Sequence, residues 1–390
     1  MRRFFGSCTR HCVLIALVVF VVSLAAPAVA QGAPPYLAGG PKSSFLIKRN
    51  GTLWSWGWNA YGQLGLGDKK RRTLPKQIAS AAPWRRVACA EFHAAGVRTD
   101  GTLWAWGWNT YWQLGLGNIP PAYQLTPTQV GTDTDWSSVS CGTRHTLALR
   151  SGGRLWGWGS NYDGELGLGD TAPRFVPTQI GEPSDTWLAV AAGDRFSAAI
   201  RSDGSLWMWG HNHWGQLGQG DKLDRPLPRP IWSQTGWKRV ALGQRHVLAL
   251  KSNGTLWAWG SNSWGQLGLG DKKARLSPVR IGKRHDWVAI ACGSFHSLAL
   301  RKDGTIWAWG MNSAGEVGTG WGVAGVLGVV KAPRRVGSAS GWLAIACGGH
   351  HSLALRTGSR LYVWGLNDEG QLGRGNRTDR YAPVRLYVSL

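Results

Sequence analysis

Histidine and cysteine are the residues of this chain best suited to metal or nucleophilic chemistry, and most of them recur at fixed places in a repeated pattern. One place holds five histidines and, in the two other copies, a serine and a phenylalanine: His93, His145, His246, His296, His351, Ser43 and Phe196. Ligands of one metal must converge to about 2 Å from a point, whereas equivalent positions around a ring diverge. We therefore expect one hydrogen bond to backbone groups in each copy, and no metal or cofactor.

The cysteines that follow the N-terminal segment share a second place, five residues after the Trp that opens each copy: Cys89, Cys141, Cys292 and Cys347. Two other copies carry Ala192 and Leu242 there. A place that accepts Cys, Ala or Leu is typical of a small buried site. Disulfides between adjacent copies, Cys89 with Cys141 and Cys292 with Cys347, need Cα atoms within about 7 Å. We expect four free, buried thiols.

Signatures of catalysis are missing from the sequence. It contains no nucleophile elbow, phosphate loop, H-E-x-x-H or C-x-x-C motif. Glycine-rich runs such as residues 265–270 follow strand patterns without the helix that a phosphate site requires. The 21 acidic residues are scattered, so paired carboxylates are also unsupported. We expect a protein that is not an enzyme.

The elements that carry these residues recur seven times, about every 50 residues, with the core L-W-x-W-G-x-N-x-x-G-Q-L-G-L-G-D. Each copy holds four short apolar segments bounded by glycine, which predict strands. Asn-Gly or Asp-Gly, as at Asp303-Gly304, joins the second segment to the third and suits a tight hairpin. No amphipathic helix pattern follows residue 30. The pattern predicts an all-β, seven-bladed β-propeller; an open solenoid is the alternative, but it needs polar caps.

Three motifs connect the chain to a known family. The sequences G-x-x-H-S-L-A-L at residues 293–300, D-G-T-L-W-A-W-G at 100–107 and G-Q-L-G-L-G-D at 265–271 closely resemble the regulator of chromosome condensation repeat. The resemblance covers residues 36–390 and implies a seven-bladed propeller closed by pairing of the chain ends. We expect one domain, residues 31–390, with repeats at 36–80, 84–131, 136–182, 187–233, 237–282, 287–337 and 342–390.

Residues 1–30 have the character of a secretory signal. Arg2, Arg3 and Arg10 precede an apolar run at residues 13–26, and Ala28-Val29-Ala30 offers a small-x-small cleavage site. The run is short for a membrane span, although an uncleaved anchor is the alternative. We expect cleavage before Gln31 and a secreted or periplasmic protein.

The chain is strongly basic, with 44 Lys and Arg, 21 Asp and Glu, and a formal net charge of +23. Such a charge attracts polyanions. Export makes nucleic acid an unlikely partner, so an anionic envelope polymer, anionic lipid or an acidic protein fits better. The alternative is a basic secreted protein without a specific polyanion site. In either case we expect a monomer with no membrane span after signal cleavage.

Binding residues are expected where the copies differ from each other. Two variable places flank the loop Asn of each copy. The first holds Trp58, Trp108, Ser160, His211, Ser261, Met311 and Leu366. The second holds Tyr61, Tyr111, Asp163, Trp214, Trp264, Ala314 and Glu369. Trp112 replaces a loop glycine, and the sixth copy inserts an apolar stretch, residues 321–330, that begins with Trp321.

The predicted partner-binding set comprises Tyr61, Tyr111, Trp112, Asp163, Trp214, Trp264, Glu369 and Trp321. Exposed Trp and Tyr act as interface anchors; the alternative is that these rings pack between loops. We predict a non-catalytic binding protein, similar to secreted bacterial family members such as the type II β-lactamase-inhibitor protein, a resemblance that implies protein recognition through aromatic loop residues. The alternatives are the family's nuclear role, guanine-nucleotide exchange on a small GTPase with chromatin binding, and a lectin.

Overall fold

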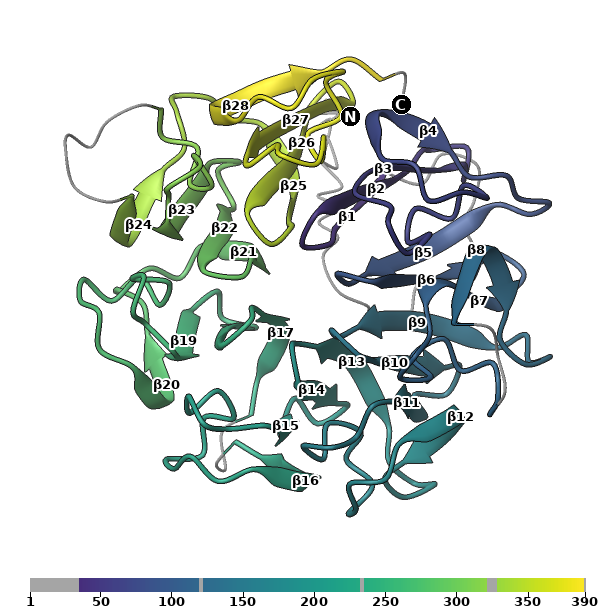
Figure 1. Cartoon of the computed structure of the whole chain (residues 1–390). Helices are drawn as coiled ribbons and strands as arrows, with labels where there is room; N and C mark the ends of the chain where they lie inside the picture. The colour runs from purple at the N-terminus through teal and green to yellow at the C-terminus, as the bar shows by residue number, and fades with distance from the viewer. Residues whose placement is uncertain (1–34, 119–121, 232–234, 321–327, 389–390) are drawn as a thin grey trace, which may run out of the picture.

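Short antiparallel strands, four to each sequence repeat, build the part of the chain that the computed structural model describes: residues 35–118, 122–231, 235–320 and 328–388. The strands form seven four-stranded sheets, or blades, each made from consecutive strands. Figure 1 shows the blades around a central axis. No helix within these residues could span a membrane. The expected signal segment and Trp321 lie outside the described residues.

The first three blades are β1 (Tyr36–Gly39), β2 (Ser43–Ile47), β3 (Leu53–Gly57), β4 (Arg72–Gln77); β5 (Trp84–Cys89), β6 (His93–Arg98), β7 (Leu103–Trp108), β8 (Tyr123–Gln129); and β9 (Trp136–Cys141), β10 (His145–Arg150), β11 (Leu155–Gly159), β12 (Arg174–Ile180). The next two are β13 (Trp187–Ala192), β14 (Phe196–Arg201), β15 (Leu206–Gly210), β16 (Arg225–Pro230); and β17 (Trp237–Leu242), β18 (His246–Lys251), β19 (Leu256–Gly260), β20 (Arg275–Arg280). The last two are β21 (Trp287–Cys292), β22 (His296–Arg301), β23 (Ile306–Met311), β24 (Val329–Arg335); and β25 (Trp342–Cys347), β26 (His351–Arg356), β27 (Arg360–Gly365), β28 (Arg380–Leu386).

The ring is closed, which confirms the propeller and excludes the open solenoid. The expected pairing of the chain ends was wrong: among the described residues β1 pairs with β2 and β28 with β27. The reason is that each repeat supplies a complete four-stranded sheet, so the seventh blade lacks no strand. The first blade instead packs beside the seventh, with β1 against β25 and β26, as neighbouring blades do elsewhere.

One buried tryptophan fills each junction between blades. It is the second Trp of the L-W-x-W motif: Trp56, Trp106, Trp158, Trp209, Trp259, Trp309 and Trp364, all 0 % exposed. Trp309 donates its indole N–H to the Gln266 carbonyl oxygen of the preceding blade at 2.8 Å. Gly268, at φ +70°, lies against this ring, and a Cβ there would sit 2.8 Å from the indole nitrogen. The first Trp of the motif, which marks the repeat, is only half-buried.

The five histidines that share one place in the repeat, which we call the ring histidines, also form hydrogen bonds across the junctions between blades. Their partners are side-chain hydroxyls rather than the backbone groups that we expected. The five Nε2–Oγ contacts measure 2.7–3.0 Å and join His93 to Thr146, His145 to Ser197, His246 to Ser297, His296 to Ser352, and His351 to Ser44. Each hydroxyl donates its one hydrogen to a backbone carbonyl of the preceding blade, as Ser297 does to Gln266 at 2.8 Å. The imidazole must therefore donate from Nε2.

The two blades without a ring histidine show that this contact is a matched pair. Where Ser43 replaces histidine, the next blade carries Ala94 in place of the hydroxyl, and where Phe196 replaces it, the next blade carries Val247. A buried imidazole N–H left without its hydroxyl acceptor would cost about 1–3 kcal/mol. The two positions therefore change together.

The ring histidines predict acid instability. Burial lowers the pKa of all five to about 3. Above the unfolded pKa of about 6.5 neither state binds a proton; below it only the unfolded chain does, so each histidine removes about 1.4 kcal/mol of stability per pH unit until the pH nears 3. We expect the free energy of unfolding, measured by urea titration, to fall steeply between pH 6 and 4.

The matched control copies the residue pair Phe196 and Val247, which replaces histidine and hydroxyl at the junction of the fourth and fifth blades. The double variant His246→Phe with Ser297→Val should lose stability less steeply with falling pH, by about 1.4 kcal/mol per pH unit, because one histidine no longer titrates. An unchanged slope would contradict the assignment.

Candidate partner-binding face

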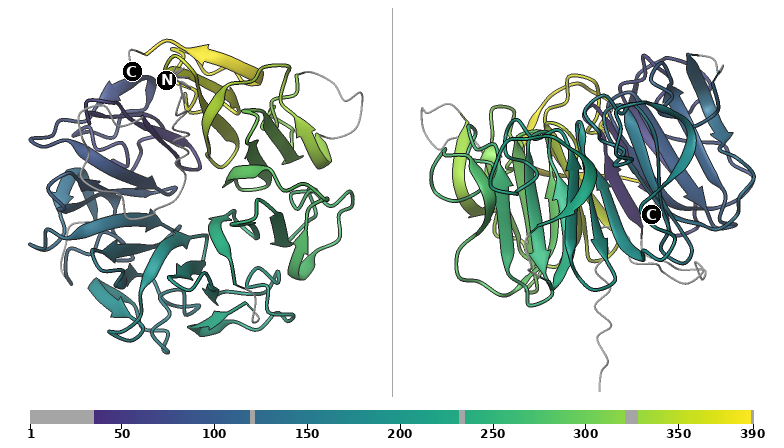
Figure 2. Two further views of the ribbon diagram at one scale, coloured as in Figure 1. Left: turned by 180° about the vertical axis from the view of Figure 1, so that it is seen from behind. Right: turned by 90° about the horizontal axis from the view of Figure 1, so that it is seen from below.

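Strand order divides the connections between the two faces of the disc. In every blade the links from first to second strand and from third to fourth strand emerge on one side, which we name the loop face. The hairpin turns from second to third strand emerge on the other, the turn face. The two connections of the loop face also touch each other. In the first blade the N–H of Trp58, just after β3, donates to the carbonyl oxygen of Lys42, just before β2, at 2.9 Å. The side view in Figure 2 shows the connections gathered at both ends of the strands.

Every predicted site residue within the described ranges lies in a third-to-fourth-strand connection, on the loop face. An asparagine in each of these connections accepts a backbone N–H, and in five blades it also donates to two backbone carbonyls. In the fourth blade the Asn212 side chain donates to the carbonyl oxygens of Asp221 and Leu223 at 3.1 Å and accepts the N–H of Leu217 at 2.8 Å. Equivalent bonds surround Asn59. Since the backbone is fixed this way, the neighbouring side chains are free to vary.

The first two blades bring aromatic residues together. We define the aromatic cluster as Trp58, Tyr61, Phe92, Trp108, Tyr111 and Tyr123, whose successive ring centroids lie 5.0–5.9 Å apart. Tyr61 is central, with Phe92 at 5.3 Å and Trp108 at 5.6 Å. All six side chains are half-buried. The cluster thus combines loop packing with an aromatic surface.

Basic side chains lie over the rings of this cluster. Lys69 Nζ is 3.6 Å from the Tyr123 centroid, Arg144 is 4.4 Å from that of Tyr111, and Lys42 is 5.1 Å from that of Trp58. Such contacts are worth about 0.5–1 kcal/mol at exposed sites. The cations are held in place without being neutralised, so the cluster presents aromatic area and positive charge together.

The predicted residues outside the first two blades do not join the cluster. Trp214 is 42 % exposed and lies under Arg245 at 4.5 Å. Trp264 is half-buried and packs 6.4 Å from Phe295. Among the predicted aromatics that the structure describes, Trp214 is the most accessible.

Three predicted residues make contacts between neighbouring blades. Asp163 faces Arg195 at 3.6 Å, and Glu369 pairs with Arg71 at 2.5 Å across the junction of the seventh and first blades. Trp112 adopts φ +59°, a conformation that its glycine counterparts tolerate better, and packs 4.6 Å from Phe175. The contacts that these three side chains make are therefore with neighbouring blades of the propeller.

The sequence analysis missed the contribution of the first-to-second-strand connection. The residue before the ring histidine also varies among the copies and lies on the loop face: Lys42, Phe92, Arg144, Arg195, Arg245, Phe295 and His350. The signal was the same variability that singled out Tyr61, at a place that we had not compared. Phe92 links the loops of Tyr61 and Trp108, so it belongs to the site.

A central channel of about 680 Å³ runs between the first strands of all seven blades. Its wall includes the four cysteines, which are free thiols as expected. Cys347 is buried, whereas the other three are half-buried rather than fully buried. Burial raises the pKa of the Cys141 thiol to about 12, so this thiol is protonated and weakly nucleophilic at neutral pH.

A closed ring with a constant backbone and a variable loop face defines a propeller of the binding or regulatory class. The chain belongs to the RCC1-like domain family. The RCC1-like domain matches residues 138–389, and the regulator of chromosome condensation (RCC1) repeat matches residues 50–97 and 100–149.

Two curated relatives match parts of the chain. The ultraviolet-B receptor UVR8 of Arabidopsis thaliana is 32 % identical over 198 residues, which cover 49 % of this chain and 44 % of UVR8. The X-linked retinitis pigmentosa GTPase regulator homolog of Caenorhabditis elegans is 29 % identical over 126 residues, 32 % of this chain and 9 % of the relative. The chain thus spans less than half the length of either relative.

Solved structures share the fold. Human WBSCR16 aligns with a TM-score of 0.78 and 22 % identity, covering 86 % of this chain and 95 % of that one. Prp20p of Saccharomyces cerevisiae, studied for its binding to Gsp1p and histones, aligns with a TM-score of 0.77 and 23 % identity over 92 % of this chain and 90 % of Prp20p.

Two tryptophans of the fourth and fifth blades test the division between face and core. Trp214→Ala should change the unfolding free energy by less than about 1 kcal/mol, because the ring is exposed. Trp259→Ala should cost about 3–5 kcal/mol, because it empties a junction and leaves a carbonyl without its donor. Thermal and urea unfolding of both variants measure the difference. Equal destabilisation would place Trp214 in the core.

Proposed function

We propose that the chain is an exported, non-catalytic binding protein that recognises a protein or an anionic envelope polymer through its loop face. The observation that carries the proposal is the aromatic cluster with Lys69 and Arg144 lying over its rings. Rigid aromatic area at low entropic cost suits an interface anchor, and fixed cations favour an acidic partner. The signal-like residues 1–30 support export.

Kinship with secreted bacterial propellers such as the type II β-lactamase-inhibitor protein is part of this proposal. It assigns recognition to Tyr61, Tyr111, Trp214 and Trp264, of which the first two lie in the aromatic cluster. Asp163 and Glu369 replace aromatic residues and are engaged by arginines, so the target need not be the same.

Charge substitution on each face gives a matched test of the binding surface. The tagged protein should capture its partner from the culture fluid or envelope of the producing organism. Replacing Lys42, Lys69 and Arg144 by Ala should weaken binding at least tenfold, about 1.4 kcal/mol, and the loss should shrink at high salt. Surface plasmon resonance with the captured partner measures both effects.

The control for that test is Lys48→Ala on the turn face. Lys48 also lies over a tryptophan, 3.9 Å from the Trp54 centroid, so the substitution removes the same type of contact from the opposite side of the disc. A partner that responds to Lys48→Ala as strongly as to the loop-face variant would overturn the assignment of the binding face.

Guanine-nucleotide exchange with chromatin binding remains the second candidate, because the RCC1-like domain match favours it. Capture of a small GTPase, followed by accelerated nucleotide release from it, would replace the proposal above. Capture that a simple sugar reverses would instead indicate a lectin, in which the cluster rings stack on the glycan.

The export part of the proposal has its own test. Residues 1–30 fused to a reporter should carry it across the membrane, and the mature protein should begin at Gln31, as N-terminal sequencing would show. The apolar run at residues 13–26 and the Ala28-Val29-Ala30 site are the physical basis. A mature protein that retains Met1 and stays in the cytosol would remove the argument against the exchange-factor alternative.

A further inference from the structure

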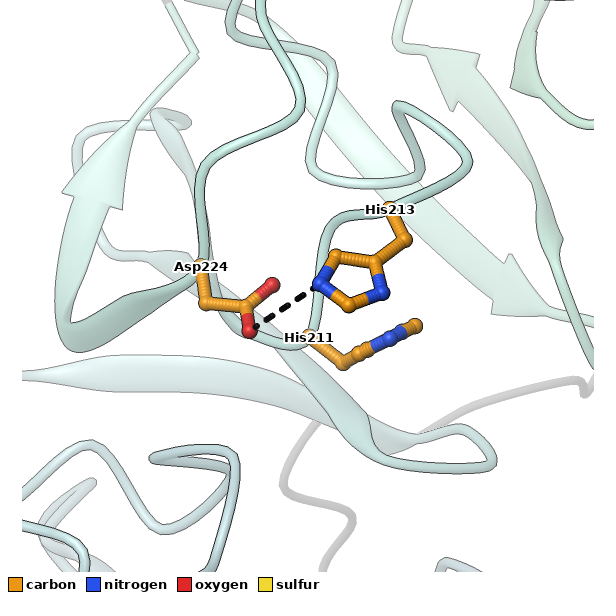
Figure 3. A group of neighbouring side chains, drawn as sticks. All are labelled: His211, His213 and Asp224. Carbon is orange, nitrogen blue, oxygen red and sulfur yellow. Dashed lines mark ion pairs between the residues drawn. The ribbon is translucent and has the colours of Figure 1, made fainter.

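We propose that His211, His213 and Asp224, in the third-to-fourth-strand connection of the fourth blade, form a binding site for a divalent transition-metal ion of the zinc type. The ligand atoms of the three residues all lie within 4.8 Å of one another. Figure 3 shows the two imidazoles side by side, with Asp224 facing His213. Imidazole and carboxylate ligands together suit Zn²⁺, Ni²⁺ and Cu²⁺.

The carboxylate is already oriented for such a role. One oxygen of Asp224 accepts the backbone N–H of Asn212 at 2.6 Å, which leaves the other oxygen 3.8 Å from Nε2 of His213. Metal-binding carboxylates are characteristically held by such a second hydrogen bond. Asn212 itself is fully buried in the loop network, so the backbone between the two histidines is rigid.

The spacing fits a metal site that closes on binding, because the three ligand atoms lie within 4.8 Å of one another before the ion is bound. A tetrahedral ion with bonds of about 2.0–2.2 Å places its ligand atoms about 3.3 Å apart. The His213–Asp224 separation of 3.8 Å exceeds this by a few tenths of an ångström. The His213 side chain is 68 % exposed and is free to make up the difference. Water or a partner's side chain can fill the remaining positions.

The seventh blade supplies an internal comparison. Its Asp379 accepts the N–H of Asn367 at 2.7 Å, as Asp224 does with Asn212. Leu366 and Asp368 stand where the fourth blade has its two histidines. The aspartate therefore serves the loop in both blades, and the histidine pair is what distinguishes the fourth. We assign the metal site to that pair.

Gln216 sets the chemical cost of using His211. Its amide nitrogen lies 2.9 Å from Nδ1 of His211, while its oxygen accepts the N–H of Trp214 at 2.9 Å. The amide therefore donates to Nδ1, and the proton of the neutral ring is on Nε2. Ligation through Nε2 requires that proton to move to Nδ1, where the amide opposes it. In the third and sixth blades a glutamate, Glu165 or Glu316, stands at the position of Gln216. A carboxylate at this position would accept a proton from Nδ1 instead of opposing it.

The test is zinc titration of the tag-free protein by isothermal calorimetry at pH 7.5. We expect one Zn²⁺ per chain, with binding weakened at least tenfold by His213→Ala and by Asp224→Asn. The latter keeps an oxygen for the Asn212 N–H and removes the carboxylate. The matched controls, Asp379→Asn in the seventh blade and His285→Ala on the inter-blade link, should bind zinc as the unmodified chain does.

Gln216→Glu should strengthen zinc binding several-fold, because a carboxylate accepts the Nδ1 proton and orients the ring. Weaker binding by this variant would contradict ligation through Nε2. Absence of a one-to-one complex, or affinities equal in the ligand variants and the controls, would overturn the site. The titration contains no partner, so its result is independent of the proposed function.

Discussion

A single backbone carbonyl in each Gly-Gln-Leu-Gly loop, that of Gln or Glu, holds each junction between blades. Gln266 accepts the indole N–H of Trp309 at 2.8 Å and the hydroxyl of Ser297 at 2.8 Å. All seven junctions have the indole bond, and five add the hydroxyl and its histidine. One such bond contributes about 1 kcal/mol, whereas an unpaired buried group costs about 1–3 kcal/mol. Because an unpaired buried group costs more than a hydrogen bond gains, these bonds favour the one arrangement of neighbouring blades in which every such group has its partner.

The same residue also positions the candidate site. The side-chain oxygen of Gln216 accepts the N–H of Trp214, and that of Gln63 accepts the N–H of Tyr61, both at 2.9 Å. The residue that joins two blades thus fixes the backbone of the variable loop position, while the side chain at that position makes none of these bonds. A change from Trp214 to Asp163 between blades therefore alters surface chemistry without disturbing the junction.

The sequence was sufficient for the seven-bladed propeller because period, turns and strand patterns are local. What it left open depends on how the copies stack. Trp207 and Trp209 look equivalent in the motif, yet only Trp209 lies fully in a junction. The sequence does contain a signal for the partners of the histidines. Where Ser43 or Phe196 replaces histidine, the next blade carries an apolar residue, Ala94 or Val247, in place of the hydroxyl. Phe92 stands at a place whose variability the sequence shows, but its aromatic neighbours come from two blades and follow only from the assembled propeller.

Basic side chains that recur at the same position in every blade differ from those that occur in only some blades. We interpret the first group as structural and the second as available for binding. On the turn face a Lys or Arg at the end of the second strand lies near tryptophan blade after blade, with Arg98 3.6 Å from Trp104 and Arg201 3.9 Å from Trp207. A contact repeated around the ring serves the fold. On the loop face the pattern is broken: aromatic rings gather in the first two blades, ion pairs occupy the third and seventh, and histidines with an aspartate occupy the fourth. Since the loop asparagine accepts an equivalent backbone N–H in all seven blades, these differences are changes of chemistry at equivalent points of one scaffold, where a repeat protein can acquire a site without refolding.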